Sequence, residues 1–290
     1  MKKIKVLIMS VGEYAKNTTA KWFEKIGGAE HCVVCLPEQF EENAKSYEKR
    51  GFETFIYDEK KYVGKTIDYF GFKPRNCGGV GRQGIAEAVD KYGDDYICFQ
   101  IDDDTAQLGV RVVDNYGNYK ATGITKWKNF EKLIRAEEEF YDKTGVECMA
   151  MTGASIPKVG DFVCNHKIFN NFIMRKGNRF NYDGFAAICS DDYRFNIMNN
   201  LLNRHPMITT NYASITFNQN QGDRTDGNAV MYNSDCSWKK SFVLKMIMPV
   251  QVEQRISKET NRVLFRENLL PSKLYPPICL EENGKIVGRL

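Results

Sequence analysis

Short, continuous runs of hydrophobic residues alternate with amphipathic stretches along the first hundred residues of the chain. Four runs lack the polar–apolar alternation of a half-exposed strand, which is typical of strands buried on both faces of a sheet: KIKVLIMS, HCVVCLP, FETFIYD and YICFQI. The stretches between them that have helical spacing or helix-end signals are NTTAKWFEKIGG, QFEENAKSYEKRG and GRQGIAEAVDKYG. This alternation predicts an α/β fold, with a mainly parallel, Rossmann-like sheet flanked by helices.

The pattern changes in the second half of the chain. A helix is predicted in NFEKLIRAEEEFYDKTG, and strands of a mixed region in VECMAMTGAS, FNNFIMRKGNRF and MITTNYASITFN. Residues 217–233 are rich in Asn and Gly and are expected to form a long loop. We therefore expect one domain over residues 1–235, with halves at 1–105 and 106–235, and a C-terminal extension over residues 236–290 packed on it.

Composition and charge narrow the class of protein. The chain is 42% hydrophobic and 27% charged, with a net charge of +4, which is globular composition. Eight lysines and arginines stand against three glutamates in residues 238–275, a local excess that suits a polyanion or a solvated helix face. No apolar stretch approaches the ~20 residues that span a bilayer, and MKKIKVLIMSVGEY lacks the features of a signal peptide. We expect no membrane association, no obligate protein partner and a cytoplasmic location.

The nine cysteines are scattered, and most lie in apolar runs, as reduced and buried cysteines do. Cys32 and Cys35 have CxxC spacing, but residues three apart in a strand point to opposite faces. With three histidines in the chain and no second CxxC, the sequence does not favour a zinc site.

Polar residues follow each of the four predicted strands, at the edge of the sheet where open α/β folds bind their ligands. The segments expected to converge there are Ser10–Tyr14, Leu36–Gln39, Tyr57–Asp58 and the triplet Asp102–Asp104 in CFQIDDDT. Three adjacent carboxylates repel one another, so the triplet is either an acidic turn in water or a site for a divalent cation. Mg²⁺ and Mn²⁺ accept carboxylate oxygens and keep positions for water and substrate phosphates.

Two further groups extend this prediction. Arg82 lies at the start of a predicted helix behind NCGGVG, where a helix N-terminus and a guanidinium both favour phosphate. Asp191 and Asp192 follow a short apolar run and begin a helical pattern, so they either cap that helix or include a general base. Neither a P-loop, nor a dinucleotide fingerprint after the first strand, nor a Ser-His-Asp triad is present in the sequence.

The segment VGRQGIAEAVDKYGDDYICFQIDDDT resembles the core of GT-A glycosyltransferases, in which an Asp-x-Asp motif follows an apolar strand. SDDYRFNIMNN is similar to their later acidic motif, and VLIMSVGEY to the start of their nucleotide site, so the resemblance covers roughly residues 3–235. It implies a GT-A fold and a metal-dependent hexosyl- or pentosyltransferase that uses a nucleotide-diphosphate sugar, with a UDP-sugar as the expected donor and Mn²⁺ or Mg²⁺ as cofactor.

The resemblance also implies roles for residues. Asp102 and Asp104 match the ends of the motif and would hold the metal. The nucleotide-sugar site would consist of Ser10, Val11, Gly12, Pro37, Glu38, Tyr57, Arg82, Asp102 and Asp103. Asp192 matches the catalytic base of inverting members, with Asp191 as the alternative. The pair is Asp-Asp where many relatives have Glu-Asp, which leaves the choice between the two and the stereochemistry open.

More narrowly, the triple aspartate and the glycine–arginine segment resemble bacteriophage TET-associated glycosyltransferases and the glycosyltransferase-like domain of the GREB1 protein. This implies 5-hydroxymethylcytosine in DNA as acceptor, in the host cytoplasm for a phage enzyme. Arg175, Lys176 and Arg179 lie among aromatic residues, as in a nucleic-acid groove, or else form the basic turn of a hairpin. Arg224 in the Asn/Gly loop is a further acceptor-side candidate.

Other functions compete with this interpretation. The acceptor of a GT-A enzyme can instead be a protein, a glycan or a small molecule. A sugar-1-phosphate nucleotidyltransferase shares a similar sheet but carries a glycine-rich basic loop after its first strand, which SVGEYAKN does not supply. A metal-dependent nuclease would need ligands for a second metal or a histidine base. A non-enzymatic nucleic-acid-binding protein would depend on the basic C-terminal region and not on the aspartates.

Overall fold

The computed structural model describes residues 2–63, 78–113, 119–144, 149–153, 162–164, 171–176, 208–217, 245–246, 252–256, 263–267, 279–282 and 285–289. Side chains are described for most of the first 143 residues and for residues 171–176. These parts contain the parallel strands, the helices that cover them and the aspartate triplet.

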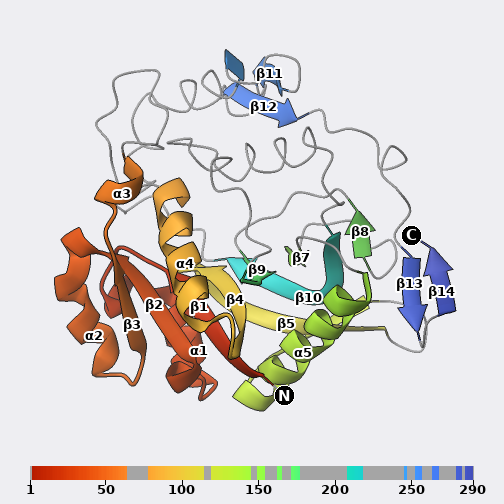
Figure 1. Cartoon of the computed structure of the whole chain (residues 1–290), viewed down its shortest axis with the longest axis horizontal. Coiled ribbons are helices and arrows are strands. Elements are labelled where there is room, and N and C mark those ends of the chain that lie inside the picture. The colour runs from red at the N-terminus through yellow and green to blue at the C-terminus, as the bar shows by residue number, and fades with distance from the viewer. Residues whose placement is uncertain are drawn as a thin grey trace.

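A ten-stranded sheet forms the centre of the molecule (Figure 1). Its parallel part has the order β3-β2-β1-β4 and consists of β1 (Lys3–Met9), β2 (Cys32–Pro37), β3 (Glu53–Tyr57) and β4 (Tyr96–Asp102). The sheet continues from β4 through β9 (Asn171–Met174), β7 (Met149–Gly153), β10 (Ile208–Phe217), β5 (Thr105–Val113) and β6 (Tyr119–Gly123), and β8 (Phe162–Cys164) pairs with β10. The predicted α/β class, with a parallel part and a mixed part, is confirmed.

Helices cover the parallel strands on both faces. One face packs against α1 (Thr18–Lys25), α2 (Ala44–Glu48) and α5 (Trp127–Thr144), whose Phe23, Tyr47 and Phe130 share a core with Phe99 of β4. The other face packs against α4 (Gly78–Tyr92), where Ile85 and Val89 meet the opposite side of the same strands. The continuous apolar runs of β1, β2 and β4 are explained by this arrangement, since both faces of these strands are buried, whereas the edge strand β3 is mostly half-buried.

Local signals at the helix ends behave largely as the sequence predicts. Asn17 caps α1 by accepting a hydrogen bond from the amide of Ala20 at 2.7 Å, and Gly27 follows the helix with a φ of 76°. The polar helix expected in QFEENAKSYEKRG is instead divided into a 3₁₀ segment, η3 (Glu38–Asn43), and the short α2. Phe40, whose φ of −122° is not helical, interrupts this segment.

The remaining elements are short. Single turns of helix are formed by η1 (Tyr14–Lys16), η2 (Ala29–His31) and α3 (Lys60–Val63). Two separate hairpins, β11 (Val252–Ile256) with β12 (Val263–Glu267) and β13 (Cys279–Glu282) with β14 (Lys285–Arg289), lie in the basic C-terminal extension. Among the described residues, no helix is both long and apolar enough to cross a membrane.

Three cysteines whose side chains the structure describes are fully buried thiols in the sheet. Cys32 belongs to the core on the α1 face, whereas Cys35 and Cys98 belong to the core on the α4 face. The CxxC pair therefore points in two directions, as predicted. Burial raises the pKa of all three thiols, that of Cys98 to about 12, because the thiolate would lose its hydration.

We expect these three thiols to resist alkylation in the native protein. The thiolate is the reactive species, and both its low population and its burial protect it. Treatment with N-ethylmaleimide at neutral pH, followed by peptide mass mapping, should leave Cys32, Cys35 and Cys98 unmodified until denaturant is added. Modification of Cys98 at the rate of a small-molecule thiol would contradict the packing of β4.

Candidate functional site

The order of the parallel strands identifies where a ligand is expected to bind. The chain proceeds outward from β1 through β2 to β3 and then returns to place β4 on the other side of β1. In open α/β sheets, ligands bind beyond the carboxyl ends of the strands at such a reversal. Ser10 follows β1 there, and the aspartate triplet forms the turn between β4 and β5.

The middle aspartate connects these two strand ends. The hydroxyl of Ser10 donates to Oδ2 of Asp103 at 2.9 Å, and the backbone carbonyl of Asp103 accepts from the amides of Thr18 and Thr19 at 3.0 and 3.2 Å. Those amides belong to the first turn of α1, where backbone donors have no partner inside the helix. Asp103 therefore ties the turn to β1 and α1, which is a structural task.

The side chain of Thr19 holds the same turn at two further points. Its hydroxyl donates to the backbone carbonyl of Asp102 at 2.5 Å and accepts from the amide of Thr105 at 2.9 Å. Thr19 is fully buried, and so is Thr105. The turn is thus fixed on both sides of the pair Asp103–Asp104.

The first aspartate faces the other side of the sheet, toward α4. Oδ1 of Asp102 lies 3.6 Å from Nη1 of Arg82 and 3.5 Å from Nε2 of Gln100. Arg82 is only 4% exposed, and its guanidinium lies over the ring of Phe172 in β9. Arg82 thus lies beside the first aspartate of the triplet, and it stands in the second turn of α4, not at the helix start where the sequence placed it. A contact between Arg82 and a donor phosphate stays a prediction.

Hydrogen bonds from Tyr47 of α2 hold the loop that follows β1. The hydroxyl of Tyr47, which is fully buried, lies 3.3 Å from Oγ of Ser10, donates to the carbonyl of Gly12 at 2.8 Å and accepts from Nδ2 of Asn17 at 3.1 Å. Nδ2 of Asn43 donates to the carbonyl of Val11 at 3.0 Å. Ser10, Val11 and Gly12 are consequently fixed next to the aspartate turn, and their contact with a nucleotide stays a prediction.

Other predicted nucleotide contacts differ in their exposure. Glu38 is exposed beyond the end of β2, whereas Pro37 is buried within it. The ring of Tyr57 is 2% exposed and packs in the core against Gly84 of α4. The helix therefore covers the ring of Tyr57, and a contact between Tyr57 and the nucleotide sugar stays a prediction.

The carboxylates of the turn could supply only some of the ligands that one divalent cation needs. Asp102 and Asp104 are both partly exposed, and carboxylate oxygens suit Mg²⁺ or Mn²⁺. Within the described residues, no group of three or more His, Cys, Asp or Glu side chains is arranged to hold a metal. A cation bound here would need phosphate oxygens or water to complete its coordination.

Two predicted acceptor residues lie elsewhere. Met174, at the end of β9, pairs with Cys98, so the antiparallel β9 carries Arg175 and Lys176 toward the amino end of β4. At about 3.3 Å per residue, this is roughly 15–20 Å from the aspartates. These two cations therefore lie at the opposite end of β4 from the aspartates, because β9 runs against β4.

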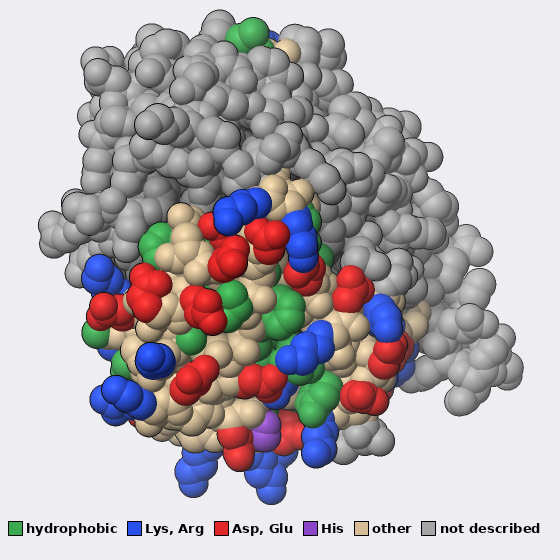
Figure 2. All heavy atoms as spheres, turned by 60° about the vertical axis from the view of Figure 1, so that its left-hand side comes forward, with side chains coloured by type: hydrophobic (Ala, Val, Ile, Leu, Met, Phe, Trp, Pro, Cys, Tyr) green, Lys and Arg blue, Asp and Glu red, His purple; other side chains and the backbone are tan. Residues whose placement is uncertain are grey.

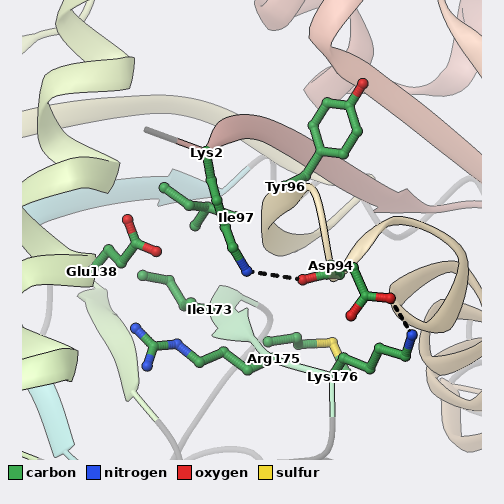
Figure 3. Close-up of a pocket in the computed structure, with 10 residues that line it drawn as sticks. Lys2, Asp94, Tyr96, Ile97, Glu138, Ile173, Arg175 and Lys176 are labelled. Atoms are coloured by element: carbon green, nitrogen blue, oxygen red, sulfur yellow. Dashed lines mark hydrogen bonds and ion pairs between the residues drawn. The ribbon is translucent and has the colours of Figure 1, made fainter.

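At that opposite edge, both cations have acidic partners. Arg175 pairs with Asp142 at 2.6 Å and lies over the ring of Tyr141, and Lys176 pairs with Asp94. Figure 3 shows the pocket that they line together with Lys2 and Glu138, which has a volume of about 160 Å³. The predicted contact of Arg175 and Lys176 with an acceptor stays a prediction.

The other predicted site residues lie outside the described residues. They are Asp191, Asp192, Arg179 and Arg224. Sequence reasoning also missed Thr19, Tyr47 and Gln100. A polar residue inside the apolar run YICFQI was the available signal for Gln100, whereas nothing in the sequence identified Tyr47 as a partner of Ser10.

Comparison with known proteins gives distant structural likenesses. No protein-family model matches the chain, and no curated protein sequence matches it. A solved structure described as a mycobacterial protein has a TM-score of 0.45 at 7% identity, over 92% of this chain and 84% of that one. Mannose-1-phosphate geranyltransferase from Thermus thermophilus has a TM-score of 0.31 at 11% identity, over 61% of this chain and 51% of that one. Because both likenesses are this distant, we base no functional conclusion on them.

Proposed function

We propose that this protein is a metal-dependent glycosyltransferase that transfers a sugar from a nucleotide-diphosphate sugar, with a UDP-sugar as the expected donor, to a hydroxyl acceptor. The observation that carries the proposal is the aspartate turn, which is fixed at the strand-order reversal between β1 and β4 by Ser10, Thr19 and Arg82.

The chemistry of such a transfer explains the carboxylates. A nucleoside diphosphate leaves poorly unless its developing negative charge is neutralised, and a bound Mg²⁺ or Mn²⁺ supplies that neutralisation. Asp104 and Asp102 would hold the cation. Arg82 limits the repulsion between them by pairing with Asp102. A separate carboxylate, for which Asp192 or Asp191 is proposed, would accept the proton of the acceptor hydroxyl.

For the acceptor we propose 5-hydroxymethylcytosine in DNA, on the resemblance of the triple aspartate to the phage enzymes. Figure 2 shows acidic and basic side chains interspersed over the described part of one face, with no large field of positive charge there. On this proposal, DNA would be bound by residues other than those of this face. Arg179, Arg224 and the basic residues 238–275 are the candidates.

The experiment is a donor and acceptor screen. The purified protein is incubated with Mn²⁺, a panel of nucleotide sugars and duplex DNA that carries either 5-hydroxymethylcytosine or cytosine, and the digested nucleosides are weighed by mass spectrometry. A mass gain on hydroxymethylcytosine alone would establish the acceptor and the sugar. Hydrolysis of one nucleotide sugar without transfer to DNA would keep the glycosyltransferase and discard this acceptor. No reaction with any donor would refute the proposal.

We also expect Mn²⁺ to bind much more tightly with a nucleoside diphosphate than alone. Two carboxylates leave most of the coordination positions of the cation to other oxygens, and the diphosphate would provide some of them. Titration of Mn²⁺, followed through the electron paramagnetic resonance signal of the free ion, should show at least a tenfold lower Kd when UDP is present. Equal affinity with and without nucleotide would mean that the protein alone completes the site.

A further inference from the structure

We propose that Thr19 is a positioning residue that sets the affinity of the aspartate turn for its metal. This rests on the proposed function, because it assigns a role to Thr19 in the same site. Thr19 would contact neither the metal nor the donor. It would act through the backbone of the turn, which determines where the carboxylates of Asp102 and Asp104 point.

The hydroxyl of Thr19 joins the two ends of the turn. It bonds to the carbonyl of Asp102 at 2.5 Å and to the amide of Thr105 at 2.9 Å, and its distance to the carbonyl of Thr105 is 3.3 Å. In a four-residue turn, the carbonyl of the first residue and the amide of the fourth are the groups that close it. Asp102 and Thr105 hold those two places, with Asp103 and Asp104 between them.

The surroundings of Thr19 make this link rigid. The residue is fully buried, in the first turn of α1, and its own amide donates to the carbonyl of Asp103 at 3.2 Å. Its β-branched side chain has few rotamers in a helix. Its single hydroxyl hydrogen can be donated either to the carbonyl of Asp102 or to that of Thr105. Because Thr19 and Thr105 are fully buried, the backbone groups that bond to this hydroxyl would lose a partner without it.

The contacts of Ser10 and Arg82 hold other parts of the turn. The bond between Ser10 and Asp103 holds the middle residue, and the pair between Arg82 and Asp102 holds one carboxylate. The amides of Thr18 and Thr19 hold the carbonyl of Asp103, and the hydroxyl of Thr19 adds the bond to the amide of Thr105, on the far side of Asp104. Mg²⁺ and Mn²⁺ bound by few carboxylates require near-octahedral geometry, so a small rotation of this turn would weaken their binding.

The test compares three substitutions of Thr19. Thr19→Val keeps the shape and removes both hydrogen bonds, Thr19→Ser keeps the hydroxyl, and Thr19→Cys keeps a weaker donor with a longer reach. The matched control is Thr54→Val, which removes a surface hydroxyl bonded to Glu48 at 2.7 Å, far from the turn. The readouts are Mn²⁺ affinity in the presence of UDP, by electron paramagnetic resonance, and the melting temperature.

We expect Thr19→Val to weaken Mn²⁺ binding at least tenfold at a temperature where the variant is folded. Thr19→Ser should stay within about threefold of the unmodified protein, and Thr54→Val should not differ from it. If Thr19→Val does not fold, Thr19→Cys should bind Mn²⁺ more weakly than Thr19→Ser does. Weaker Mn²⁺ binding by Thr19→Cys than by Thr19→Ser would show the role of the hydroxyl without the valine variant.

The outcomes separate this inference from the function on which it rests. If the unmodified protein binds no Mn²⁺ with UDP or any other nucleoside diphosphate, the metal-dependent function fails and the role of Thr19 fails with it. If the unmodified protein binds Mn²⁺ and the valine or cysteine variant binds it equally well, Thr19 serves only the stability of the fold. A lower melting temperature with unchanged Mn²⁺ affinity would have the same meaning.

Discussion

Replacing Asp104 with asparagine should lower the rate of sugar transfer, or of donor hydrolysis, by at least about a hundredfold. Asparagine keeps the size of the side chain and removes the charge that holds the cation, and stabilising charge on a leaving group is worth several kcal/mol. Because each 1.36 kcal/mol changes a rate about tenfold, the loss should be easy to detect. The measurement is the turnover rate at saturating donor over a range of Mn²⁺ concentrations.

Asp103→Asn provides the matched control for this prediction. The carboxylate of Asp103 accepts a hydrogen bond from Ser10, and the carbonyl oxygen of asparagine can accept the same bond. We expect a decrease of less than about tenfold, since the backbone carbonyl that holds the amides of α1 is unchanged. If Asp103→Asn is inactive and Asp104→Asn is active, the assignment of the metal ligands within the triplet is reversed.

The largest effect on stability is expected from Gly84→Ala in α4. A Cβ atom at Gly84 would overlap the ring of Tyr57, which is fully buried between β3 and the helix and cannot move aside without displacing its neighbours. Overpacking of a core costs about 1–3 kcal/mol, more than the helix propensity that alanine contributes. The melting temperature should fall by roughly 5 °C, measured by differential scanning calorimetry.

Gly81→Ala, one turn earlier in the same helix, is the comparison. A Cβ atom there meets Sδ and Cγ of Met9, whose unbranched and partly exposed side chain can change rotamer. Its effect should be small, because the gain in helix propensity offsets the rearrangement of Met9. Equal destabilisation by the two substitutions would show that α4 requires glycine for its backbone and not for its close approach to Tyr57.

The sequence predicted the parallel half of the fold because burial on both faces leaves a direct pattern. Each continuous apolar run became a strand, and the rule for strand-order reversals brought Ser10 to the aspartates. The strand β5 was missed although its signal was present: Leu108 and Val110 alternate with Gln107 and Gly109 in TAQLGVRVV.

Directions within the site could not be predicted in the same way. Successive residues of a turn point in different directions, so Asp102 faces Arg82 while Asp103 faces Ser10, and only the folded structure separates their tasks. The placement of Arg175 depended on whether β9 runs with or against β4. Local sequence does not contain that information, since pairing partners about 75 residues apart determine it.

The contacts of Ser10, Thr19 and Arg82 that hold the aspartate turn come from residues 10–105, and Phe172 stacks on Arg82. During synthesis, β1 to β4 and α1 can therefore assemble the turn soon after residue 105 has left the ribosome, before the mixed strands exist. The same separation affects evolution. On the proposed function, insertions and substitutions after β5 can change the acceptor specificity, while the residues that hold the carboxylates stay the same.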